Sequence, residues 1–115
     1  AIDLAKGVAL LATHPGPLLG YALVEGGLAR IGPGVAPTIA IPTTAGTGSE
    51  VGRAAMLNVG GRKLDVISPH LLPARALCDP DLTLGLPPGL TAATGRPARR
   101  APGVPWRGRV RGAVG

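Results

Sequence analysis

The sequence predicts an α/β fold, and three features of its pattern support that class. Apolar residues recur at helical spacing over residues 1–13, and a short apolar run at 37–41 opens into a loop rich in Gly and Thr. Two further apolar stretches flank Gly60-Gly61. Helices that alternate with short strands are the pattern of α/β domains. The length of 115 residues suits one modest domain.

Residues 1–13 predict a helix that is buried on much of its circumference, because apolar residues occupy two of its faces. Pro15-Gly16-Pro17 ends this helix, and residues 18–29 predict a second, weaker helical stretch interrupted by glycines. The apolar residues of the first helix form two rows: Ile2, Ala5, Ala9 and Ala12, and Leu4, Val8 and Leu11.

Two short apolar runs predict strands. Residues 37–41 carry Ile39 and Ile41 between prolines, which is typical of a buried strand in a parallel sheet. Residues 74–78 form another such run, which Asp79-Pro80 ends. We expect Cys78, at the end of this run, to be a small core residue rather than a nucleophile.

A hairpin and a second helix complete the predicted elements. Residues 54–59 and 63–67 flank Gly60-Gly61, a turn signal of the hairpin type. Leu86-Pro87-Pro88 then leads into residues 89–94, which predict the start of a helix.

The loop at 42–50 combines hydroxyl groups with glycines. Gly46 and Gly48 carry no side chains, so backbone N–H groups can approach a ligand closely. This chemistry suits a phosphate or a ribose, although the loop has neither a Walker A ending nor a Gly-x-Gly-x-x-Gly pattern. On composition alone, a structural turn and a ligand loop remain equally open. The hydroxyls belong to Thr43, Thr44, Thr47 and Ser49.

The net charge of +6 lies entirely in the last 20 residues. Residues 1–95 hold six basic and six acidic residues, whereas residues 96–115 hold six arginines and no acid. We interpret residues 96–115 as a disordered or out-of-frame tail. The alternative is a small non-catalytic protein that binds nucleic acid through Arg107–Gly112 and Trp106; we disfavour it because short charge-rich motifs are weak signals.

The string IPTTAGTGSE at 41–50 closely resembles a signature of the iron-containing (group III) alcohol dehydrogenase family. Further strings resemble the same family in the same order, so that the resemblance spans residues 1–95. They are IDLAK at 2–6, Arg62-Lys63 with Ser68-Pro69 and Leu72-Pro73, CDPDLT at 78–83, LPP at 86–88 and TAATG at 91–95.

This resemblance implies a partial Rossmann-like cofactor domain of an NAD(P)-dependent oxidoreductase. Residues 1–80 would belong to that domain, and residues 81–95 would begin a helical domain that binds divalent iron in the intact family. The reaction implied is hydride transfer between an alcohol or aldehyde and NAD or NADP, with the metal as Lewis acid. The resemblance also implies a cytoplasmic protein, often a homo-oligomer. No apolar run approaches the roughly 18 residues of a membrane span, and the single cysteine fits a reducing compartment.

The resemblance also carries site residues over to this sequence. Thr43, Thr44 and Ser49, with Gly46 between them, fall on cofactor-contacting positions of the loop. The ammonium of Lys63 would reach the cofactor, and Asp3 would end the segment that binds its pyrophosphate. Gly52 stands where the family commonly has Thr, so one hydroxyl contact would be missing.

Two departures from the family lead us to expect an inactive chain. Ala1 lies where the family's Gly-Gly-Gly-Ser loop has already ended, so the first strands of the cofactor domain would be absent. Pro97 and Ala101 occupy the positions of an Asp and a His that bind the metal, and neither side chain can do so. His14 and His70 lack ligand partners at suitable spacing. We therefore expect no metal site and a chain that folds poorly or aggregates when isolated.

Overall fold

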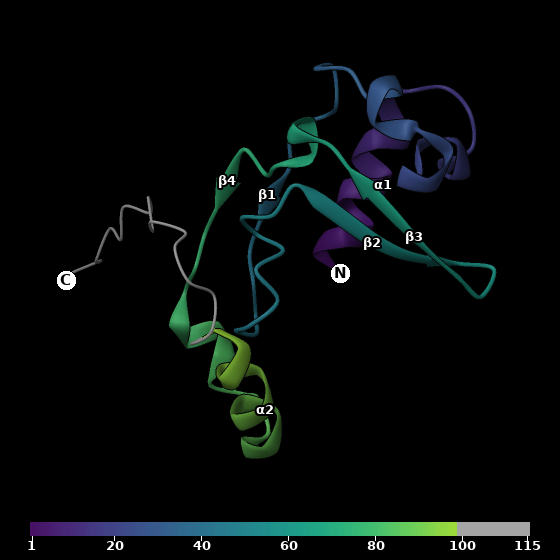
Figure 1. Ribbon diagram of the computed structural model, residues 1–115. Helices are drawn as coiled ribbons and strands as arrows, with labels where there is room; N and C mark the ends of the chain where they lie inside the picture. Colours follow the sequence, from purple (N-terminus) through teal and green to yellow (C-terminus); the bar gives the residue numbers. More distant parts are fainter. Residues whose placement is uncertain (99–115) are drawn as a thin grey trace.

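The computed structural model describes residues 1–98, and its core lies between one helix and one hairpin (Figure 1). Helix α1 (Ile2–Thr13) packs against strand β2 (Ala54–Val59), which pairs with strand β3 (Arg62–Ile67). Three short 3₁₀ helices follow α1 and close the same core. The buried apolar residues are Leu10, Tyr21, Ile31, Ala55, Leu57, Val66 and Leu71.

The predicted hairpin is confirmed. Strands β2 and β3 pair antiparallel, with Val59 opposite Arg62 and Ala54 opposite Ile67. Gly60 and Gly61 form the turn with φ values of 58° and 77°, as a two-residue turn with positive φ at both positions requires. Ala55 and Leu57 of β2 and Leu64 and Val66 of β3 are buried on one face of the hairpin. On that face α1 contacts β2, and two of the 3₁₀ helices contact β3.

Helix α1 is confirmed, but it is less buried than its apolar rows predict. Leu4, Val8 and Leu11 are exposed, and the buried face includes Gly7 and Leu10. Gly7 allows this packing because a Cβ on it would lie 2.9 Å from Leu57 Cδ1. The row of Leu4 and Val8 therefore faces away from the hairpin.

The helical stretch predicted over 18–29 is broken into 3₁₀ turns at Leu18–Tyr21, Leu23–Glu25 and Gly27–Arg30. Gly26 adopts a left-handed conformation between the last two, and a Cβ on Gly27 would lie 2.1 Å from the backbone carbon of Tyr21. The glycines thus permit a tight path that a regular α-helix could not follow.

The two short apolar runs form a parallel pair, as predicted for the first of them. Strand β1 (Ile39–Ala40) pairs with β4 (Arg75–Ala76), with Ile39 opposite Arg75. The predicted burial is wrong for Ile39 and Ile41, which are 62% and 50% exposed, while only Ala40 is buried. No further strand among residues 1–98 pairs with β1, so its second edge is unpaired there.

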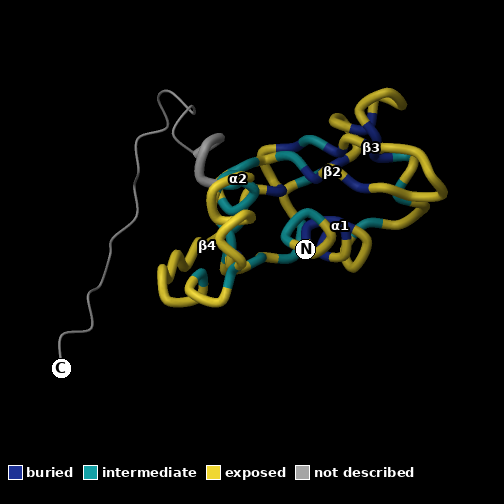
Figure 2. The backbone as a smooth tube through the Cα atoms, turned by 90° about the horizontal axis from the view of Figure 1, so that it is seen from below, coloured by how far each residue is buried: buried dark blue, intermediate teal, exposed yellow. Residues whose placement is uncertain are grey.

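The prediction that Cys78 lies in the core is wrong, because Cys78 is exposed. It follows β4, and both residues of β4 are exposed as well (Figure 2).

Helix α2 spans Pro88–Ala98 and so includes the first three residues of the predicted tail. The remaining tail residues, with the nucleic-acid alternative at Arg107–Gly112, lie outside the described residues. None of the described helices combines the length and hydropathy needed to cross a membrane.

Candidate functional site

The loop between β1 and β2 is the candidate site. It leaves β1 after Ala40, passes α2, and returns beneath the N-terminal half of α1 before it enters β2 (Figure 1). Gly46 and Gly48 have φ values of 107° and 66°, conformations that side chains disfavour. A Cβ on Gly46 would lie 2.3 Å from the carbonyl oxygen of Thr94 in α2. The loop therefore needs glycine at position 46 to pass the helix.

The open part of the loop presents unused donors. Thr43 and Thr47 are exposed and Thr44 is half-buried. Within residues 1–98, the backbone N–H groups from Thr43 to Gly48 have no hydrogen-bond acceptor. Exposed N–H groups beside hydroxyls and glycines are suited to phosphate or ribose oxygens. This arrangement favours the ligand-loop interpretation over a structural turn.

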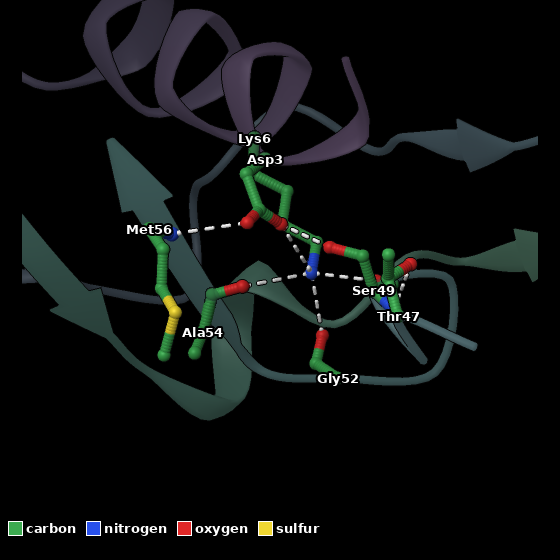
Figure 3. Close-up of polar contacts among 7 residues, drawn as sticks. All are labelled: Asp3, Lys6, Thr47, Ser49, Gly52, Ala54 and Met56. Atoms are coloured by element: carbon green, nitrogen blue, oxygen red, sulfur yellow. Dashed lines mark hydrogen bonds and ion pairs between the residues drawn. The ribbon is translucent and has the colours of Figure 1, made fainter. Parts of the chain in front are cut away.

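Asp3 and Ser49 are brought together, but they bind each other. The Ser49 hydroxyl donates to Asp3 Oδ1, and the Met56 amide donates to Asp3 Oδ2 at 3.2 Å (Figure 3). Both carboxylate oxygens of Asp3 are thus engaged by the loop and by β2. In this structure Asp3 joins α1 to the loop, and the Ser49 hydroxyl proton is already used.

Lys63 lies apart from the loop. It is exposed in β3 opposite Asn58, near the tip of the hairpin. The loop ends at Arg53, and Asn58 lies five positions further along the extended chain, which corresponds to about 16 Å. A ligand bound at the loop would have to extend along the hairpin to reach the Lys63 ammonium.

The residue that sequence reasoning missed is Lys6. Its side chain is only 1% exposed, and its ammonium donates to the carbonyl oxygens of Ser49, Gly52 and Ala54 at 2.7, 2.8 and 2.9 Å (Figure 3). Burial lowers the pKa of Lys6, while the charges of Asp3 and Glu50 oppose that effect. One signal was available: Lys6 lies four residues before Leu10, on the helix face that is buried.

Residues 1–98 offer no donor set for a metal ion. Within residues 1–98, no three His, Cys, Asp or Glu side chains are grouped so that they could hold an ion. His14 and His70 lie in separate places. His14 Nε2 accepts from the Gly32 amide at 3.1 Å, and His70 is exposed in a 3₁₀ turn. Pro97 falls within α2, whereas Ala101 lies outside the described residues.

Comparison with known proteins gives consistent matches for most of the chain. The family model described as iron-containing alcohol dehydrogenase matches residues 1–80. The chain is 64% identical over 99 residues to 4-hydroxybutyrate dehydrogenase of Cupriavidus necator, covering 85% of this chain and 26% of that protein. It therefore spans about a quarter of the length of that relative.

Solved structures show the same fold in this segment. The crystal structure of sulfoacetaldehyde reductase from Bifidobacterium kashiwanohense, in complex with NAD+, matches with a TM-score of 0.72 and 34% identity. The match covers 84% of this chain and 25% of the reductase chain. Alcohol dehydrogenase from Oenococcus oeni matches with a TM-score of 0.75 and 36% identity over the same shares.

Proposed function

This chain belongs to the iron-containing alcohol dehydrogenase family, and on that premise we propose that it carries part of the binding site for a nicotinamide dinucleotide. The observation that carries the proposal is the loop at 43–48. Its N–H groups have no acceptor among residues 1–98, and its exposed hydroxyls lie beside two glycines of positive φ. The known complex of a structural neighbour with NAD+ adds support.

Several residues of the loop would donate hydrogen bonds to the oxygen atoms of the cofactor. Thr43 and Thr44 would donate hydroxyls, and Gly46 would let the backbone approach closely because no side chain intervenes. Asp3 and Ser49 would act through their mutual hydrogen bond, which holds the loop against α1. Lys63 would contribute only where the ligand runs along the hairpin.

The whole reaction proposed is oxidation of an alcohol, or the reverse reduction of an aldehyde. When bound, NAD+ or NADP+ would provide the nicotinamide ring that accepts the hydride from the alcohol. A metal does not fit residues 1–98, so we route no step through one and expect no turnover by this chain. Small alcohols and aldehydes as substrates, a homo-oligomeric state and a cytoplasmic location belong to the same proposal. The location rests on the family and on the single cysteine, which cannot form an intramolecular disulfide.

Titration of the full chain with NAD+ and NADP+, followed by saturation-transfer NMR, tests the proposal. We expect a signal that the double variant Thr43→Val, Thr44→Val weakens and that Thr83→Val leaves unchanged. Thr83 is the matched control because its hydroxyl donates to Pro80 within a 3₁₀ turn. Equal binding by all three proteins would refute the loop as the site, and alcohol oxidation by the chain with added ferrous ion would refute the expected inactivity.

A further inference from the structure

The Lys6 ammonium makes a complete set of hydrogen bonds to one short segment. An ammonium has three N–H donors, and the three carbonyl acceptors come from Ser49, Gly52 and Ala54. These residues cover the C-terminal part of the loop and the first residue of β2. No buried side-chain polar atom of residues 1–98 is left without a partner. A single side chain of α1 therefore fixes three peptide groups, two in the loop and one at the start of β2.

The direction of these carbonyls sets the direction of neighbouring N–H groups. In a trans peptide the C=O of one residue and the N–H of the next point in opposite directions, and no cis peptide occurs among the described residues. Because Ser49 and Gly52 turn their carbonyls toward Lys6, the amides of Glu50 and Arg53 point away from it. Neither amide has an acceptor within residues 1–98.

Asp3 completes the arrangement around the same loop. Its carboxylate lies 3.9 Å from the Lys6 ammonium, which partly compensates the buried charge. The same carboxylate accepts the Ser49 hydroxyl. Ser49 is thus held by its carbonyl through Lys6 and by its side chain through Asp3. The two residues lie one turn apart on α1, so the helix acts as a rigid base for the loop.

We propose that Lys6 is a positioning residue of the cofactor site, which orients the backbone donors of the loop without touching the ligand. This inference rests on the proposed function of the loop. Lys6 is too buried to contact a ligand itself. Its effect passes through the peptide groups from Ser49 to Ala54, which anchor the open segment from Thr43 to Gly48 at its C-terminal end.

The test compares Lys6→Met with the wild-type chain in two measurements. Lys6→Met keeps the length of the side chain and removes all three donors, and Arg62→Met is the matched control because Arg62 is an exposed cation at the hairpin turn. The first measurement is amide hydrogen exchange, at Val51 in the loop and at Leu64 in the hairpin. The second is the dissociation constant for NAD+.

We expect Lys6→Met to speed exchange at Val51 by at least about tenfold, the loss expected for one hydrogen bond from a charged donor. Exchange at Leu64 changes much less, and NAD+ binding weakens by a similar factor. Lys6→Gln keeps two N–H donors, so we expect it to restore part of the slow exchange at Val51 and part of the NAD+ affinity. Arg62→Met leaves both unchanged. Partial recovery in Lys6→Gln would show that the hydrogen-bond donors at position 6 position the loop, because a general loss of packing would not be restored by donors.

Several outcomes would overturn the inference. Unchanged exchange at Val51 in Lys6→Met would show that the loop does not depend on the ammonium. Faster exchange with unchanged NAD+ affinity would show that the anchoring has no consequence for the ligand. If Lys6→Met and Lys6→Gln both fail to fold, Lys6 is a determinant of the core instead. Absence of NAD+ binding by the wild-type chain would contradict the proposed function, while exchange at Val51 would still decide whether Lys6 fixes the loop.

Discussion

Gly46 passes the carbonyl oxygen of Thr94 so closely that a Cβ on the glycine would lie 2.3 Å from it. The loop meets α2 at this point. The Thr94 oxygen belongs to the backbone of α2, so it cannot move away by a side-chain rotation. We expect Gly46→Ala to destabilise the chain by about 1–3 kcal/mol from backbone strain alone, with the collision in addition. Urea unfolding measures the change.

Gly48→Ala is the matched control for that experiment. Gly48 also has a positive φ, of 66°, but nothing lies within 4 Å of a Cβ built on it. Gly46, with a φ of 107°, lies outside the left-handed region that contains Gly48. The difference between the two variants therefore combines the contact with α2 and the greater backbone strain at position 46. Equal destabilisation by both would mean that the loop does not rest on Thr94.

The buried ammonium of Lys6 predicts a pH dependence of stability. Burial lowers the pKa of Lys6 below 10.5 in the folded chain, against the opposing charges of Asp3 and Glu50. Just below pH 10.5 the unfolded chain then binds more protons at this residue than the folded chain does, so the free energy of unfolding rises with pH. Lys6→Met lacks this contribution.

We therefore expect the stability of the wild-type chain relative to Lys6→Met to increase as the pH is raised toward 10.5. Urea unfolding of both chains at several alkaline pH values measures this difference, and the other ionisable groups cancel because both chains contain them. If the stability of the wild-type chain relative to Lys6→Met decreased as the pH was raised, folding would raise the pKa of Lys6 instead of lowering it. The hydrogen bonds from the ammonium to the carbonyls would then outweigh its desolvation.

A third prediction concerns the contact between His14 and Gly32. The Gly32 amide donates to His14 Nε2 at 3.1 Å, and the Thr13 hydroxyl lies 3.0 Å from Nδ1. His14→Phe removes the acceptor and keeps a ring next to Tyr21, whose ring it meets edge-on. We expect a loss of about 1–3 kcal/mol from the unsatisfied amide, measured by urea unfolding. His70→Phe, at an exposed position, should change stability much less, and similar losses in both would refute the contact.

One edge of β1 is unpaired within residues 1–98, and this edge predicts self-association. The carbonyls of Thr38 and Ala40 bond to the β4 side, so the backbone groups of Ile39 point to the opposite edge. An apolar groove of about 290 Å³ lies between the start of α1 and the β1 segment, and Ile39 lines it. Unpaired apolar edges promote aggregation.

We expect light scattering to show concentration-dependent association of the chain, and Ile39→Lys to reduce it. Leu84→Lys is the control, since Leu84 is 80% exposed and does not line this groove. A wild-type chain that stays monomeric at high concentration would contradict this prediction, together with the expectation that the isolated chain aggregates.

The elements with local signals were predictable from the sequence, because their determinants lie within the segment itself. Gly60-Gly61 defines the hairpin, and Pro15-Gly16-Pro17 ends α1. Burial was harder to predict, because it depends on what packs against an element. Ile39 has the composition of an inner strand residue, yet nothing within the described chain covers it.

The candidate site shows the same limit. The glycines and hydroxyls at 43–49 marked the loop, and the resemblance assigned Asp3 to it. Asp3 and Ser49 bind one another, and Lys6 rather than Lys63 contacts the loop, because α1 packs against β2 next to the loop. Contacts between residues more than forty positions apart leave no periodic trace in the sequence.

The pairing of β1 with β4 has a consequence for the order in which the chain folds. The hairpin closes through two glycines and forms within about 1–10 μs, whereas β1 must find β4 after a long intervening segment has been ordered, at an entropic cost. Each of these strands has only two residues, so little is gained on closure. This pair should be the last part to form and the first to open, which would release the start of the loop at Ile41 while α1 still holds its end.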